Sequence, residues 1–187
     1  GDVKYSPDGP VIGEIAARLS GGYMSGWMFP YSSGVEVTAA ALNLSVGLPA
    51  GDLTPEWEGV SAERAYISIP GVVDEISGIR DAERIVGVKN VLPRIAVGDS
   101  VRFPTNNVQK CGNIISQSYD RESAVRSAER GLGEISIRLR PGSEETIEYL
   151  FRRKDTWPPQ AFMLHDQRNL SLLSSMPRFR VEAPSVP

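Results

Sequence analysis

The sequence is poor in the residues that build disulfide frameworks and soft-metal clusters. Its 187 residues include one cysteine, Cys111, and one histidine, His165. A lone cysteine excludes an internal disulfide framework, and a lone histidine excludes a histidine-rich metal cluster. The binding of a hard cation through carboxylates stays open.

A surplus of basic residues and long apolar runs are also missing. The 20 Lys and Arg residues are outnumbered by 23 Asp and Glu residues, so the formal net charge is -3. This balance argues against nucleic acid as a partner. No apolar run reaches the roughly 18 residues that a membrane span needs, and the N-terminus lacks the pattern of a signal peptide. We therefore expect a reducing, cytoplasmic setting and no membrane partner.

The patterns of apolar and turn residues in the sequence predict an α+β fold. Alternating apolar residues on either side of Ser6-Pro7-Asp8-Gly9 predict a hairpin over residues 1–15. Helix-forming residues predict a helix over 35–46, which Gly47 ends. Short apolar runs broken by Gly, Pro or Asn predict an antiparallel sheet further along the chain, with strands in 65–73, 89–97, 99–105 and 111–118.

A second helix and one more strand follow. Asp120 is a suitable N-cap for a helix that runs to about Leu132 and stops at Gly133. Ala124, Val125, Ala128 and Leu132 fall on one face of this helix. The alternation of Ile135, Ile137 and Leu139 with polar residues predicts a half-buried strand, so the helix should pack on the sheet.

These patterns divide the chain into three parts. Residues 48–63 contain two prolines and two glycines, which places a boundary near residue 60. We predict a first unit over 1–60, a β-rich subdomain over 61–150 and a proline-rich tail over 151–187. The chain starts at Gly1, without methionine and inside the hairpin, so we expect a piece of a longer protein.

The hairpin carries the candidate chemistry. Asp2 and Glu14 lie on its two strands, and both carboxylates can reach one point across the turn. Magnesium favours such a site because it takes one or two carboxylates together with substrate phosphates. For an arbitrary pair of acids, the solvent-exposed face of a hairpin is the alternative interpretation.

An anion site follows directly after these acids. Arg18 can bind a phosphate or a carboxylate with two directed hydrogen bonds. The backbone N–H groups of Ser20, Gly21 and Gly22 can complete an anion cradle. The alternatives are a pairing of Arg18 with Glu14 and a plain flexible turn at the glycines.

At these residues the sequence resembles the carboxylate-amine ligase branch of the ATP-grasp superfamily. The string GDVKYSPDGPVIGEIAARLSGG is similar to the last catalytic hairpin of that superfamily. The stretches IPGVVDEISGI and GDSVRFPTNNVQKCGNIISQSYDRESAVRSAE resemble its β-rich C-terminal subdomain, so the resemblance covers roughly residues 1–140. The tail from residue 141 onward resembles nothing we can name.

The resemblance implies roles for the hairpin residues. Asp2 and Glu14 would be magnesium ligands, Glu14 and Arg18 would contact the ATP phosphates, and Arg18 would be the catalytic anion binder. Ser20, Gly21 and Gly22 would contact the substrate. The sequence departs from the family at Ala16, where many members have asparagine as a further metal ligand.

The resemblance also implies the reaction. ATP would phosphorylate a carboxylate, an amine would attack the acyl phosphate, and ADP and phosphate would be released. The remaining nucleotide-binding parts would lie upstream, so the isolated chain should be inactive. A homodimer stays open, and the acid and the amine are not defined.

Two other functions stay open at this point. One is a β-rich module without catalysis that binds a partner chain through the aromatic residues in 23–31. The other keeps the superfamily but changes the chemistry to a carboxylation or a purine-pathway ligation. Cys111 is expected to be a buried small residue, and His165 a surface residue. The group Thr105, Asn106, Asn107 and Lys110 is expected to form a turn, with the active cleft as the less favoured position.

Overall fold

The structure, a computed structural model, describes residues 1–151. Our predictions for the tail from residue 152 onward, including the one for His165, lie outside the described residues. Within 1–151 the strands form antiparallel sheets with helices between them, which confirms the predicted α+β class. The helices and strands in chain order are β1 Asp2–Ser6, β2 Gly9–Glu14, the π-helix η1 Met24–Met28, α1 Phe29–Ser33, α2 Val37–Ser45, β3 Val60–Tyr66, β4 Gly71–Ser77, α3 Ile79–Glu83, β5 Val88–Pro93, β6 Ser100–Val101, β7 Gly112–Ser118, α4 Arg121–Glu134, β8 Ser136–Leu139 and α5 Glu144–Phe151.

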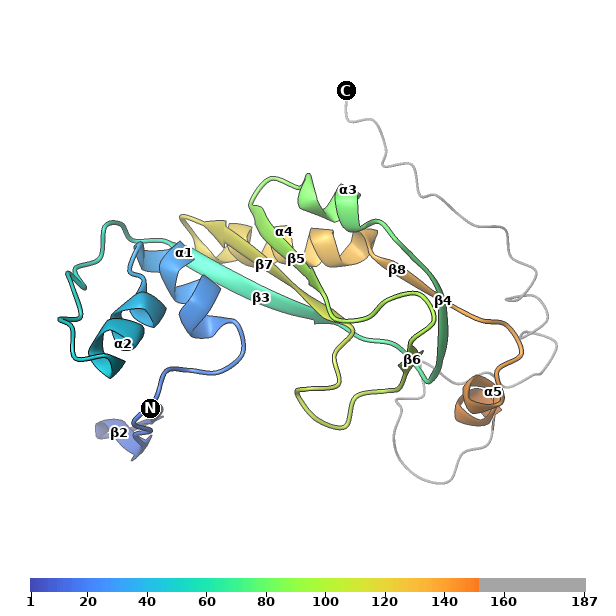
Figure 1. Ribbon diagram of the computed structural model, residues 1–187, viewed down its shortest axis with the longest axis horizontal. Coiled ribbons are helices and arrows are strands. Elements are labelled where there is room, and N and C mark those ends of the chain that lie inside the picture. The colour runs from blue at the N-terminus through green and yellow to red at the C-terminus, as the bar shows by residue number, and fades with distance from the viewer. Residues whose placement is uncertain (152–187) are drawn as a thin grey trace.

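The strands form three sheets. Strands β1 and β2 make a two-stranded hairpin, the middle sheet has the order β3-β7-β5, and the third has the order β6-β4-β8. Figure 1 shows the hairpin, α1 and α2 at one end of the molecule and the third sheet with α5 at the other. The middle sheet and α4 connect these two ends.

Helix α4 packs on the middle sheet because its inward face is small and apolar. The side chain of Asp120 accepts a hydrogen bond of 2.8 Å from the backbone N–H of Ser123, which caps the helix as predicted. Ala124 and Ala128 have no exposed surface, and Ile114 of β7 is equally buried against them. The short alanine side chains let the helix approach the sheet closely.

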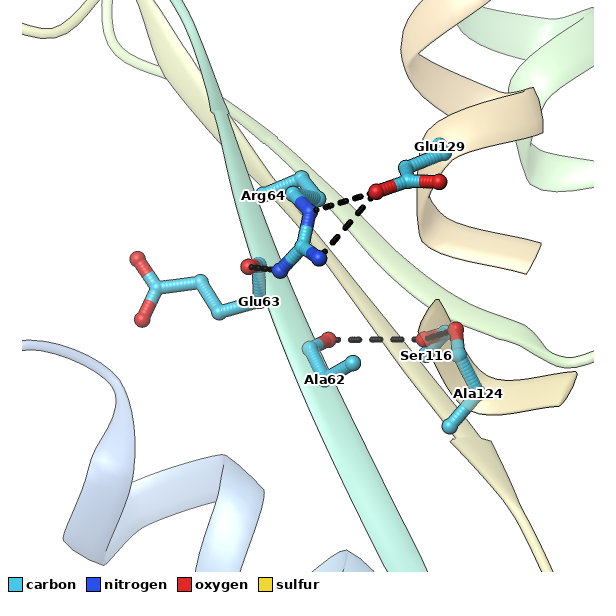
Figure 2. A network of polar contacts seen from close by, with 6 residues as sticks. All are labelled: Ala62, Glu63, Arg64, Ser116, Ala124 and Glu129. Atoms are coloured by element: carbon cyan, nitrogen blue, oxygen red, sulfur yellow. Dashed lines mark hydrogen bonds and ion pairs between the residues drawn. The ribbon is translucent and has the colours of Figure 1, made fainter. Parts of the chain in front are cut away.

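Polar contacts also join this helix to the sheet (Figure 2). The fully buried hydroxyl of Ser116 donates a hydrogen bond of 2.5 Å to the carbonyl oxygen of Ala124. At the solvent edge, Nε and Nη2 of Arg64 both donate to one carboxylate oxygen of Glu129, at 3.2 and 3.1 Å. A buried hydrogen bond therefore holds the inner side of the helix and an ion pair holds its outer side.

Several predicted boundaries were wrong. The middle sheet begins at Val60, and the predicted strand 65–73 covers the end of β3, a turn that contains Pro70, and the start of β4. Helix α4 does not stop at Gly133 as predicted. It continues to Glu134 and ends where the backbone of Ile135 becomes extended. The predicted strand 99–105 is reduced to β6, since the backbone N–H of Thr105 turns back to the Gln109 side chain. The short elements η1, α1, α3 and α5 were not predicted.

Candidate functional site

The hairpin brings the two predicted metal ligands together. Asp2 and Glu14 are direct cross-strand partners in the antiparallel pair of β1 and β2. The register shifts between Asp2 and Val3, so that Gly13 is the extra residue of β2 and Glu14 lies opposite Asp2. The turn is held by the hydroxyl of Ser6, which donates to the carbonyl oxygen of Gly9 at 2.9 Å.

The surroundings of this acidic pair suit a hard cation. Both residues are exposed, and neither forms an ion pair with any residue in 1–151. The described residues contain no cluster of three or more His, Cys, Asp or Glu side chains that could hold a metal by themselves. Two exposed carboxylates at partnered positions suit magnesium when phosphate oxygens and water complete its shell.

Arg18 lies just beyond β2, in a segment without regular structure. Its Nη1 atom donates to the adjacent carbonyl oxygen of Leu19 at 3.1 Å, and it forms no ion pair with Glu14 or with any other described residue. Because most of the donors of its guanidinium group stay unused, Arg18 can accept an anion from outside the chain.

Arg18 also lines a surface pocket of about 370 Å³ between this segment, η1, α1 and β3. Of the predicted cradle, Ser20 shares this lining, whereas Gly21 and Gly22 are absent from it. The apolar part of the wall consists of Leu19, Met24, Met28, Phe29 and Val37. Sequence patterns did not reveal this pocket, because its walls come from segments that meet only in the fold.

The segment that contains the aromatic residues in 23–31 is largely helical. Residues 24–33 form η1 and α1, and η1 contains the bond from the N–H of Phe29 to the carbonyl oxygen of Met24 that defines a π-turn. The hydroxyl of Tyr31 lies 2.5 Å from Oδ1 of Asn90 on β5, and the indole N–H of Trp57 donates to the carbonyl oxygen of Tyr31. Single-turn π-helices inside helical segments frequently occur at functional sites.

A second polar cluster lies on the middle sheet, away from the hairpin. Asn113 is buried, and its amide nitrogen donates to the carboxylate of Glu63. Nζ of Lys110 lies 3.7 Å from the same carboxylate. Lys110 therefore joins the loop after β6 to β3. Among the group expected to form a turn, the side chain of Asn106 accepts a hydrogen bond from the backbone of Val108, as in an Asx turn.

Cys111 has the environment of a core residue. Its side chain is 2% exposed, and burial raises the pKa of its thiol. Burial also raises the pKa of the neighbouring Tyr66 to about 12. Neither group is ionised near neutral pH, so neither supplies a nucleophile.

Comparison with known proteins gives a family match for the middle of the chain. Residues 65–140 match the family model described as L-amino acid ligase C-terminal domain 2. This match bears out the predicted resemblance over these residues, which are less than half of the chain. A search of curated proteins gave no match.

Two solved structures share the fold of this chain. Phosphoribosylglycinamide synthetase from Anaerococcus prevotii superposes with a TM-score of 0.66 and 12% identity, covering 74% of this chain and 36% of that protein. L-amino acid ligase from Bacillus licheniformis superposes with a TM-score of 0.60 and 17% identity, covering 74% of this chain and 35% of that protein. The chain thus spans about a third of either structure. None of the helices in residues 1–151 has the length and apolar character to cross a bilayer.

Proposed function

We propose that this chain supplies part of the catalytic site of an ATP-dependent carboxylate-amine ligase. The observation that carries the proposal is the pairing of Asp2 with Glu14 across the hairpin, followed by Arg18, which lines a pocket and forms no ion pair within residues 1–151. The ATP-grasp fold and the match at residues 65–140 support the same assignment.

In the proposed reaction, a carboxylate oxygen of the acid attacks the terminal phosphorus of ATP, and ADP leaves. The amine nitrogen then attacks the acyl carbon of the acyl phosphate. The new C–N bond forms as the C–O bond to phosphate breaks, and the amine loses a proton. Both steps need charge stabilisation on oxygen atoms more than covalent help from the protein.

The hairpin residues have distinct parts in this reaction. Asp2 and Glu14 would hold magnesium, which neutralises negative charge on the phosphoryl group when it is bound. Arg18 orients an anionic group of the substrate or the acyl phosphate by two parallel hydrogen bonds. Ser20 lines the same pocket as Arg18, which supports a contact of Ser20 with the substrate.

The family match favours an amino acid as the acid that is activated, since the matching domain is named for L-amino acid ligases. The superposition on phosphoribosylglycinamide synthetase favours a purine-pathway type of ligation as the second candidate. A panel of acids and amines, with ADP release as the readout, separates the two candidates.

The test is the substitution Glu14→Gln in the full-length gene product that carries these residues. It keeps the shape of the side chain but removes its charge, so we expect ADP formation to fall by a factor on the order of 10²–10³. The control is Asp8→Asn, which removes one charge from the exposed turn at the other end of the same hairpin. Equal activity of Glu14→Gln and Asp8→Asn, with both variants folded, would refute the catalytic assignment.

A further inference from the structure

One face of the middle sheet carries a polar cluster whose role the proposed magnesium and anion sites leave open. Side chains alternate between the two faces of a strand, so Glu63 lies on the face opposite to Arg64 and α4. Figure 2 shows this arrangement, with the carboxylate of Glu63 pointing away from Glu129. Ser61 lies on the same face as Glu63, and its hydroxyl donates to the carbonyl oxygen of Met28 in η1. The cluster is therefore on the side of the sheet that η1 contacts.

Asn113 of β7 is buried on this face with only part of its amide group satisfied. The residue is 1% exposed, and Ala65, its direct partner on β3, offers no polar side-chain group. Glu63 is its diagonal neighbour, and the carboxylate of Glu63 accepts a hydrogen bond from Nδ2 of Asn113. Because an ionised carboxylate accepts but does not donate, this bond fixes the orientation of the amide. Oδ1 of Asn113 is thereby left buried without a hydrogen-bond partner among residues 1–151.

Lys110 approaches this cluster without completing it. Its Nζ atom lies 3.7 Å from Oε1 of Glu63, which is longer than the roughly 2.7–3.2 Å of an N–H···O hydrogen bond. Oε1 is also the atom that accepts the hydrogen bond from Asn113. Buried polar atoms without partners are rare in folded proteins, and a bound group that supplies the missing donor is one explanation.

The chemistry of the cluster favours a positively charged donor as this group. The carboxylate of Glu63 repels anions, and the two oxygen atoms that face a ligand, on Glu63 and Asn113, are both acceptors. A primary ammonium group carries three N–H donors and a positive charge, so it can donate to both residues together. The ammonium group of Lys110 already lies near this carboxylate, which shows that the site accepts a group of this kind.

We propose that Glu63 and Asn113 bind the primary ammonium group of the amine substrate. The amine displaces Lys110 from Glu63, since the side chain of Lys110 is partly exposed and only loosely paired. The inference rests on the proposed ligase function, for which it names the residues that bind the second substrate.

The position of the cluster suits this part in the reaction. Ser61 lines the same pocket as Arg18 and precedes Glu63 by two residues, which is about 7 Å along β3. An amine held at Glu63 therefore lies within the length of a small substrate of an acid held at the pocket. Glu63 and Asn113 would position the amine and take no part in the transfer of the phosphoryl group.

The first test measures binding to the 187-residue chain by NMR, with isotope-labelled asparagine residues. Glycinamide is the probe, because it has a primary ammonium group and no carboxylate for Arg18 to bind. Its trimethylammonium analogue keeps the positive charge but has no N–H on that nitrogen. We expect glycinamide to shift the side-chain amide signal of Asn113 and to bind about tenfold or more tightly than the analogue. Equal binding of the two compounds, or no shift of the Asn113 signal with glycinamide, would overturn the inference.

A matched pair of variants locates the charge that binds the amine. Glu63→Gln keeps an oxygen acceptor for Nδ2 of Asn113 but loses the negative charge, so we expect the affinity for glycinamide to fall about tenfold or more. Glu129→Gln is the control, because it removes the carboxylate that pairs with Arg64 on the opposite face of the sheet. This control should bind glycinamide as the unchanged protein does. Equal affinities of the two variants, with both folded, contradict the inference.

A third variant gives a readout even if Glu63→Gln fails to fold. Lys110→Met keeps an unbranched side chain but removes the ammonium group that competes for Glu63. We therefore expect glycinamide to bind several-fold more tightly to this variant. If Lys110 serves only to tie its loop to β3, the affinity stays the same or falls, and that result refutes the displacement.

Kinetics of the full-length gene product separate this inference from the proposed function. In Glu63→Gln we expect KM for the amine to rise about tenfold or more, while KM for ATP and for the acid stay unchanged. If ADP still forms and KM for the amine is unchanged as well, the inference fails while the ligase function stands. If no acid and amine support ADP formation but glycinamide still shifts the Asn113 signal, the ligase function fails while the ammonium site stands.

Discussion

Substitution of Gly78 by alanine should destabilise the β-rich part of the chain by more than the cost of holding alanine in a left-handed backbone conformation. Gly78 precedes α3 with a φ of 81°, and a Cβ atom built on it lies 1.7 Å from the carbonyl oxygen of Glu134, at the end of α4. That separation is about half of an ordinary van der Waals contact of roughly 3.5–4.0 Å. Because the clashing atom is backbone, relief requires a shift of α3 relative to α4.

The expected magnitude follows from a comparison with Gly98. Gly98 has a similar φ of 95°, but a Cβ atom built there meets nothing within 4 Å. Alanine at either position takes on the left-handed conformation at a cost of about 1–2 kcal/mol, and about 0.4–1 kcal/mol of this is offset by a less flexible unfolded chain. Only Gly78→Ala adds the steric cost, which is about 1–3 kcal/mol for an overpacked site.

Urea unfolding of the 187-residue chain, followed by circular dichroism, measures this difference directly. We expect Gly78→Ala to lose about 1–3 kcal/mol more of the unfolding free energy than Gly98→Ala, which corresponds to a further fall in Tm of roughly 2–4 °C for each kcal/mol. The two glycines lie in the same part of the chain, so a separate unfolding step does not confuse the comparison. Equal losses in the two variants would refute the steric argument and the close approach of α3 to α4.

Two further substitutions test how α4 is held. Asp120→Ala removes the N-cap of α4. The hydrogen bond from the backbone N–H of Ser123 lowers the pKa of the Asp120 carboxyl in the folded protein. The cap therefore stabilises the fold at pH values above the ordinary carboxyl pKa of 3.8, and this stabilisation is lost as the pH falls through the lowered folded pKa. We expect the difference in unfolding free energy between the unchanged protein and Asp120→Ala to shrink as the pH is lowered. A difference that does not change with pH speaks against the cap. Ser116→Ala removes a buried hydrogen bond to α4, and we expect a loss of about 1 kcal/mol in urea unfolding. No measurable loss would mean that the hydroxyl does not stabilise the packing of α4 on β7.

The sequence by itself determined the local elements whose signals lie close together along the chain. Turn residues between two apolar runs were sufficient to predict the hairpin. The register shift that brings Glu14 opposite Asp2 was not predicted, because the register set by the turn pairs Asp2 with Gly13. The N-cap at Asp120 and the alanine spacing were sufficient to predict α4, because capping and helical periodicity act within a few residues. The roles of Asp2, Glu14, Arg18 and the cradle remain predictions.

Only the tertiary structure decided where the short helices end and which residues surround Arg18. Helices of five residues such as α1 and α3 have weak local signals, since most of their stability comes from packing against the rest of the fold. The pocket joins Arg18 in a loop, Met28 in η1 and Ser61 in β3, and no local periodicity relates residues so far apart. Their meeting depends on how η1 packs on the middle sheet, which is a property of the whole fold.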